Sequence, residues 1–191
     1  MMGPFISQND EIEERNKHNK NIIDNLQPNI NDNINIEEII SFISSYLSSI
    51  IQNNKLMKKK QSKGKDEPLY SKTIPVLSLY NYLIRIIKYT EAENNTLIAA
   101  FIYILKLVEK EKFILGINNI YILLLSSVVL AKKVLEDINN NNSYYCQIGG
   151  ISPEKLNLAE YSLFTRLNFE LNLKKEEIDE VYKNIINMKY D

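Results

Sequence analysis

Residues 118–137 read NNIYILLLSSVVLAKKVLED. A helix built from this stretch carries apolar side chains on nearly every side, and a soluble helix of that kind is normally buried by neighbours all round. A membrane span is the competing interpretation, but a span needs roughly 20 apolar residues. Two serines, Ser126 and Ser127, interrupt the apolar run, and two lysines, Lys132 and Lys133, close it. We therefore predict the central helix of a globular helical domain, whose two lysines must reach the surface or a partner.

The composition of the whole chain excludes several kinds of site. The 191 residues include 23 Lys+Arg and 24 Asp+Glu, so the charge gives no overall push toward nucleic acid or anionic lipid. The single cysteine, Cys146, excludes an internal disulfide and a cysteine-built zinc site, and it suits a reducing compartment. The one histidine, His18, lies in a polar stretch, which argues against a histidine triad or metal cluster.

The sequence also predicts where in the cell the protein is located and which ligands it does not bind. The start of the chain lacks the apolar core of a signal peptide. We therefore expect an intracellular protein, in the cytoplasm, the nucleus or both. No metal, cofactor, nucleic acid or membrane is expected to bind.

Helical periodicity dominates the apolar pattern, and glycine and proline are scarce at five each, so we predict an all-α fold. Residues 1–34 are polar and predict a weakly ordered tail. Residues 35–53 predict an amphipathic helix capped by Asn35. Packing of that helix on the domain's own core is the favoured interpretation, and contact with a partner is the alternative. A basic linker at 54–68 precedes a compact domain at 69–191.

The compact domain is expected to contain six helical segments. Proline fits the first turn of a helix, so Pro75 is taken as the start of the first one. Ser152, Pro153 and Glu154 form a second start signal, with a cap, a first-turn proline and an acid. The expected segments are 75–89, 94–109, 118–137, a short helical or irregular stretch at 143–148, a helix from Ser152 to Leu167, and a last helix from about Asn172.

Two polar features are interpreted as solvated surface. The run Asn139 to Asn142 belongs to a composition rich in asparagine, and such tracts usually lie in loops or tails. It is interpreted as a compositional habit without function. The ending Lys133-x-x-Glu136-Asp137 of the central helix is interpreted as a solvated helix end.

An ordered set of short motifs runs from about Ser71 to Ile186. The set comprises Tyr82-Leu83-x-Arg85-Ile86-x-Lys88-Tyr89, Ala100-x-x-Tyr103-Ile104, Ala131-x-Lys133, Tyr144-Tyr145, Gly149-Gly150-Ile151-Ser152, Leu156-Asn157-x-x-Glu160 and Leu167-x-Phe169-x-Leu171. In this order and spacing the motifs resemble the cyclin box of the P-type cyclins, also called phosphate-pathway or U-type cyclins. The resemblance implies a five-helix bundle around a buried third helix, with an extra N-terminal helix and a C-terminal helix.

Two pairs of residues depart from the family's pattern. Leu105 and Lys106 stand where the family usually has Asp-Arg, and Tyr121 and Ile122 stand where it usually has His-Arg. The family's internal buried ion pair is therefore expected to be missing. That loss need not destabilise the fold, because apolar groups that replace a buried pair are often neutral or favourable.

The resemblance implies a non-catalytic regulatory subunit that binds and activates a cyclin-dependent serine/threonine kinase. In this family a lysine at the end of the third helix and a glutamate on the fifth lie at the kinase interface, and here they are Lys133 and Glu160. An ammonium donates to carbonyls and a carboxylate accepts from N–H groups, which suits both to the backbone ends of a partner helix. Supporting apolar contacts are assigned by their position near the two charges to Leu135, Ile138, Tyr144, Tyr145, Ile148 and Phe164.

Other interpretations stay open beside this one. Patterning alone favours solvated positions for Lys133 and Glu160, because cations are stabilised at a helix C-terminus in any case. The changed positions Leu105 and Tyr121 leave room for a cyclin-like scaffold that activates no kinase. A transcription-factor-type module would need a basic surface, which the near-neutral charge does not favour. An enzyme is not expected, since no paired carboxylates, phosphate loop, metal cluster or activated nucleophile emerges.

Overall fold

The computed structural model describes residues 34–57 and 67–190, and within these ranges every regular element is a helix. The predicted all-α fold is thereby confirmed. The predicted tail up to residue 33, His18 and most of the basic linker lie outside the described residues. The elements are α2 (Ile36–Leu56), η1 (Glu67–Leu69), α3 (Leu79–Thr90), α4 (Asn94–Lys110), α5 (Ile120–Leu135), α6 (Asn142–Gly149), α7 (Pro153–Arg166) and α8 (Lys175–Tyr190).

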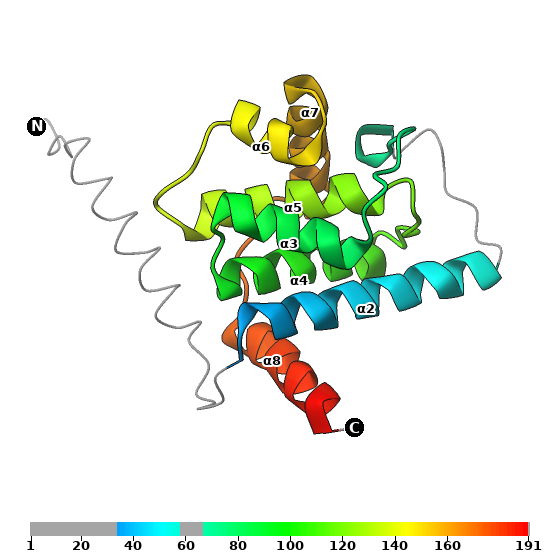
Figure 1. The fold of residues 1–191 in the computed structure, drawn as a ribbon, viewed down its shortest axis with the longest axis vertical. Coiled ribbons are helices and arrows are strands. Elements are labelled where there is room, and N and C mark those ends of the chain that lie inside the picture. Colours follow the sequence, from blue (N-terminus) through cyan, green and yellow to red (C-terminus); the bar gives the residue numbers. More distant parts are fainter. Residues whose placement is uncertain (1–33, 58–66, 191) are drawn as a thin grey trace, which may run out of the picture.

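The predicted central helix is α5, and it is enclosed as expected. Every residue of α5 except Lys133 and Val134 is buried. Helices α3, α4, α6 and α7 all contact it (Figure 1). Each fully buried Leu, Ile or Val side chain contributes roughly 1.5–3 kcal/mol relative to an exposed one. The apolar character of α5 on all its sides is therefore what holds four other helices around it.

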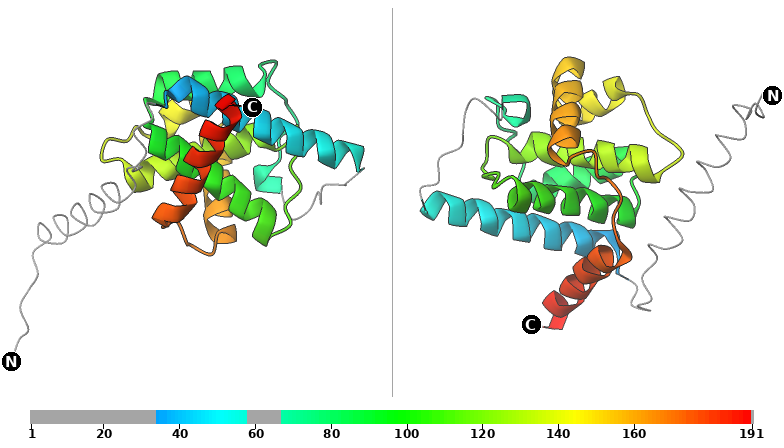
Figure 2. Two further views of the ribbon diagram at one scale, coloured as in Figure 1. Left: turned by 90° about the horizontal axis from the view of Figure 1, so that it is seen from below. Right: turned by 180° about the vertical axis from the view of Figure 1, so that it is seen from behind.

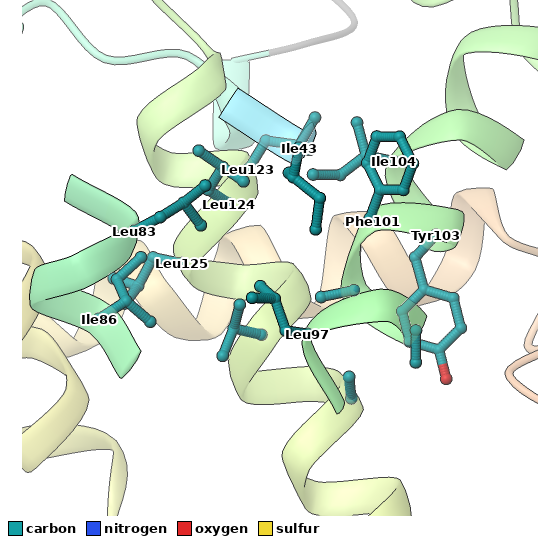
Figure 3. Packing of buried hydrophobic residues seen from close by; sticks show 14 of the residues in the cluster. Ile43, Leu83, Ile86, Leu97, Phe101, Tyr103, Ile104, Leu123, Leu124 and Leu125 are labelled. Atoms are coloured by element: carbon teal, nitrogen blue, oxygen red, sulfur yellow. The ribbon is translucent and has the colours of Figure 1, made fainter. Parts of the chain in front are cut away.

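The helices form three layers. Helices α6 and α7 cover one face of α5, and α3 and α4 lie beside it in the middle (Figure 1). Helices α2 and α8 lie on the opposite side, as the view from behind also shows (Figure 2). In the core, Leu124 and Leu125 of α5 and Leu83 of α3 belong to one buried cluster (Figure 3). Phe42 of α2 packs edge-on against Phe101 of α4, with ring centroids 5.9 Å apart.

Helix α2 packs against the rest of the domain. Its N-cap Asn35 accepts a hydrogen bond from Glu38 N–H at 2.9 Å, and the Glu38 carboxylate accepts one from Asn35 N–H at 3.0 Å. Ile39, Ile43 and Leu47 are fully buried against neighbouring helices. The helix ends at Leu56, so residues 54–56 belong to it and not to the linker.

The predicted start of the first helix at Pro75 is wrong. Helix α3 begins at Leu79, and its N-cap is Ser78, whose Oγ accepts a hydrogen bond from Asn81 N–H at 3.2 Å. The preceding segment is not helical, and the side chain of Val76 is fully exposed and not part of an apolar face. Proline fits a helix start and an extended segment equally well, and the serine cap decides between them.

The last helix also begins later than predicted, at Lys175 and not near Asn172. The carboxylate of Glu177 accepts a hydrogen bond from Lys174 N–H at 2.8 Å, which closes the first turn of α8. The segment before α8 is held to α4, because the Tyr103 hydroxyl donates to the Leu171 carbonyl at 2.8 Å.

Candidate functional site

Lys133 and Glu160 come from different helices and meet at the surface. Lys133 lies in the last turn of α5, and its Nζ donates to Glu160 Oε1 on α7 at 2.7 Å. Solvent reaches 36% of the Lys133 side chain and 10% of the Glu160 side chain. The pair is therefore neither dispersed nor sealed inside the fold, and its lysine side chain is partly exposed.

The sequence around Glu160 explains its position. Ser152 caps α7 by accepting from Lys155 N–H at 3.2 Å, and Pro153 occupies the first turn, as the start signal predicted. Leu156, Ala159 and Leu163 then form the buried stripe of the helix. Glu160 lies one turn beyond Leu156 at the edge of this stripe, which brings its carboxylate against the end of α5.

The second oxygen of the Glu160 carboxylate is bonded by a residue at the start of helix α6. Asn142 is the first residue of α6, and its Nδ2 donates to Glu160 Oε2 at 2.7 Å and to Asn157 Oδ1 at 2.6 Å. Both oxygens of Glu160 are thus engaged, one by Lys133 and one by Asn142. The sequence interpretation missed Asn142, since nothing in the run of asparagines distinguishes this position from its neighbours.

The run Asn139 to Asn142, interpreted from the sequence as a compositional habit, makes specific structural hydrogen bonds around the start of α6. Asn139 Nδ2 donates to the Glu136 carbonyl at 2.8 Å, and Asn140 N–H donates to the Tyr145 hydroxyl at 3.1 Å. Asn141 caps α6 by accepting from Tyr144 N–H at 3.0 Å. The loop joins two helix ends, where backbone groups lack intrahelical partners. An asparagine side chain serves there because it both donates and accepts.

Lys132 points away from the site and is buried. It pairs with Glu136, which also accepts from Thr96 Oγ1 at 2.6 Å and from Glu93 N–H at 3.1 Å. Solvent reaches only 5% and 10% of the Lys132 and Glu136 side chains. The prediction that the end of the central helix is solvated is therefore wrong for Glu136. A buried charge needs a partner, and this network supplies it while it ties the end of α5 to the start of α4.

The six supporting apolar residues divide into two groups. Leu135, Tyr145 and Ile148 are buried, whereas Tyr144 and Phe164 are partly buried and Ile138 is 84% exposed. Burial also raises the pKa of the Tyr145 phenol. The Tyr144 hydroxyl donates to the Tyr89 carbonyl at 2.7 Å. Of the six, only Ile138, Tyr144 and Phe164 therefore have side chains that solvent reaches appreciably, and the other three belong to the buried core.

Among residues 34–57 and 67–190, no three or more His, Cys, Asp and Glu side chains are grouped so that they could hold a metal ion. In these same ranges, none of the helices has the length and apolar character needed to cross a membrane.

Comparison with known proteins gives the family of this helical domain. The family model described as Cyclin matches residues 5–171. Cyclin-U4-3 of Arabidopsis thaliana is 38% identical over 103 residues, which cover 53% of this chain and 47% of that protein. Cyclin-U1-1 of the same plant is 32% identical over 126 residues, covering 65% and 60%. The PHO85 cyclin-like protein psl1 of Schizosaccharomyces pombe is 34% identical over 110 residues, covering 56% and 45%.

The bundle around α5 and these matches define the class of the protein, a cyclin box. The chain belongs to the cyclin family, in the group of the P-type or U-type cyclins. It spans about half the length of the curated relatives that it matches.

Proposed function

We propose that this chain is a non-catalytic regulatory subunit that binds a cyclin-dependent serine/threonine kinase and activates it. The observation that carries the proposal is the Lys133–Glu160 pair, which joins two helices and leaves the lysine side chain partly exposed. The name of the fission-yeast relative, a PHO85 cyclin-like protein, supports a kinase of this kind as the partner.

The chemistry of the pair suits recognition of a helix on the partner. An ammonium has three donors, of which Glu160 uses one, so Lys133 retains donors for backbone carbonyls. The carboxylate oxygens of Glu160 have further lone pairs for N–H groups at a helix start. In a protein kinase, a helix carries the glutamate that pairs with the ATP-binding lysine. A subunit that holds this helix inward activates the kinase without any chemistry of its own.

The direct test is purification with the bound kinase. The chain is expressed with a tag in its source cells, the kinase that co-purifies is identified by mass spectrometry, and its binding and activity are measured with purified components. The Lys133→Ala/Glu160→Ala variant should weaken binding by about 30-fold or more, because removal of interfacial charged groups typically costs roughly 2–5 kcal/mol. Kinase activation should fall in parallel.

A second surface ion pair provides the matched control. Lys110 and Glu170 form a 3.2 Å pair whose side chains are 51% and 69% exposed. The Lys110→Ala/Glu170→Ala variant removes the same charges and should bind and activate as the wild type does. Unchanged binding by the Lys133/Glu160 variant would remove the assigned interface.

The alternative is a cyclin-like scaffold that binds a kinase without activating it. Lys106, one of the residues that depart from the family's pattern, pairs with Glu177 of α8 at 2.8 Å. A stable complex without a gain in kinase activity would favour this alternative. Salt-dependent binding to DNA would instead favour a transcription-factor-type module.

We also propose an intracellular location, in the cytoplasm, the nucleus or both. The one cysteine, Cys146, is buried as a free thiol, which suits a reducing compartment. Fluorescence microscopy of the tagged full chain tests this location, and secretion into the medium would contradict it.

A further inference from the structure

We infer that Asn142 is a positioning residue, which fixes the Glu160 carboxylate in the orientation that the Lys133–Glu160 pair presents to its partner. The inference rests on the proposed function and adds to it a residue outside the pair. Asn142 bonds Glu160 at 2.7 Å and Asn157 at 2.6 Å, and it is itself partly buried.

The amide of Asn142 is suited to this task because it is a neutral double donor. Both its hydrogens point at acceptors, Asn157 Oδ1 and Glu160 Oε2, while Lys133 takes Glu160 Oε1. The last torsion of a glutamate side chain is broad and leaves a carboxylate free to rotate. A carboxylate that is bonded at both oxygens loses that freedom before the partner arrives. Binding then incurs a smaller ordering cost.

Helix α6, which carries Asn142, is anchored on the domain by two contacts. Arg85 Nε donates to the Ile148 carbonyl at 2.9 Å, and the Tyr144 hydroxyl donates to the Tyr89 carbonyl at 2.7 Å. Both contacts fasten α6 to α3. Asn142 is therefore presented from a helix that is anchored on the domain, and not from a loose loop.

The test is a double-mutant cycle on the affinity for the co-purified kinase. Asn142→Ala alone should weaken binding roughly 3- to 10-fold, the range expected for one lost hydrogen bond to a charged group that solvent partly screens. In the Glu160→Ala background the same substitution should cause no further loss, because Asn142 then has no carboxylate to orient. Equal losses in both backgrounds, or no loss in the wild-type background, would overturn the inference.

An isosteric variant separates positioning from space filling. Asn142→Asp keeps the shape but replaces the donor with a second carboxylate facing Glu160, so it should weaken binding more than Asn142→Ala does. A purely packing role requires the reverse order. Asn140→Ala is the matched control, since Asn140 contributes its backbone N–H to the loop and alanine retains it. Thermal unfolding of each variant verifies that the fold is intact.

The two proposals fail in different ways. If the wild-type chain binds no kinase, the proposed function is overturned, and the role of Asn142 in binding is overturned with it. If the wild-type chain binds its kinase but the losses from Asn142 and Glu160 add, only the inference on Asn142 is overturned.

Discussion

Lys132 and Glu136 form an ion pair one helical turn apart, with almost no exposure of either side chain. The adjacent Lys133 turns outward to Glu160 and the solvent. Successive residues of a helix differ by about 100° in direction, which sends the two neighbouring lysines to opposite environments. Lys132 thereby pairs with Glu136, which links the end of α5 to the start of α4, and Lys133 lies at the surface in its pair with Glu160.

Removal of the Glu136 carboxylate should be strongly destabilising. Glu136→Ala leaves Lys132 as an uncompensated buried charge, a situation that typically costs about 3–5 kcal/mol. Urea unfolding followed by circular dichroism measures the change. Glu111→Ala is the control, because its 3.7 Å pair with Arg166 is 42% exposed at Glu111 and should contribute less than about 1 kcal/mol. Similar small effects for the two variants would show that solvent reaches the Lys132 network.

Gly149 should not tolerate a side chain. A Cβ at this position would collide with Cδ2 of Leu125, which is fully buried in α5. Overpacking of this kind costs about 1–3 kcal/mol, so Gly149→Ala should lower the free energy of unfolding by that amount. Gly150→Ala, where φ is +65° and the space is open, should lose only about 1 kcal/mol to backbone strain.

The collision itself is tested by a second substitution. Leu125→Ala alone should cost about 2–5 kcal/mol through the cavity that it leaves. In that background the added methyl of Gly149→Ala enters the cavity and should be nearly neutral. Additive losses would mean that Gly149 and Leu125 do not interact.

Stability should fall at alkaline pH because tyrosines are buried. Burial raises the pKa of Tyr182 to about 12. The unfolded chain loses this proton near pH 10, so between about pH 10 and 12 the unfolded state binds fewer protons than the folded state. The contribution of Tyr182 to the free energy of unfolding should therefore be constant well below pH 10 and fall above it, by up to about 1.4 kcal/mol per pH unit.

Tyr182→Phe isolates this contribution. The variant should lose about 1 kcal/mol at pH 7, because the Tyr182 hydroxyl no longer donates to Asn95 Oδ1 at 2.9 Å. Its slope above pH 10 should be shallower than that of the wild type. Some slope remains, since burial also raises the pKa values of Tyr82 and Tyr103. Urea unfolding at pH 8, 10 and 11 measures the slopes, and parallel slopes would contradict the assignment.

Local signals in the sequence were sufficient for most of the fold. The apolar surface of residues 120–135 on all sides required burial, and the Ser152-Pro153 start located α7. Pro75 misled because proline is also compatible with the extended segment before Ser78. The cap that decides the start of α3 is a single serine, which carries a weaker signal than a proline.

The candidate site was only partly accessible from the sequence. The spacing of the motifs, together with the family resemblance, indicated Lys133 and Glu160. Asn142 and the burial of Glu136 depend on contacts with residues far away in sequence, such as Thr96, forty positions before Glu136. The spacing of apolar residues in a sequence carries no information about such a contact. A polar residue with a partner far away in sequence therefore shows the same pattern as a solvated one.

Arg85 should control the rigidity of α6, the helix that presents Asn142. Its Nε donates to the Ile148 carbonyl at 2.9 Å and its Nη2 to the Gln147 carbonyl at 3.4 Å, so it caps the C-terminal end of α6. In Arg85→Ala, amide hydrogen exchange over residues 142–149 should accelerate about tenfold, which corresponds to roughly 1.4 kcal/mol of lost local stability.

Exchange in α4 should stay unchanged in Arg85→Ala, because α4 does not depend on this cap. Lys88→Ala serves as the control, since it removes a cation from the exposed side of α3, the helix that also carries Arg85. Equal protection of α6 in the wild type and in Arg85→Ala would mean that the buried side chains of Tyr145 and Ile148 hold the helix alone. In that case the Arg85 contacts would add nothing to the placement of Asn142 against Glu160.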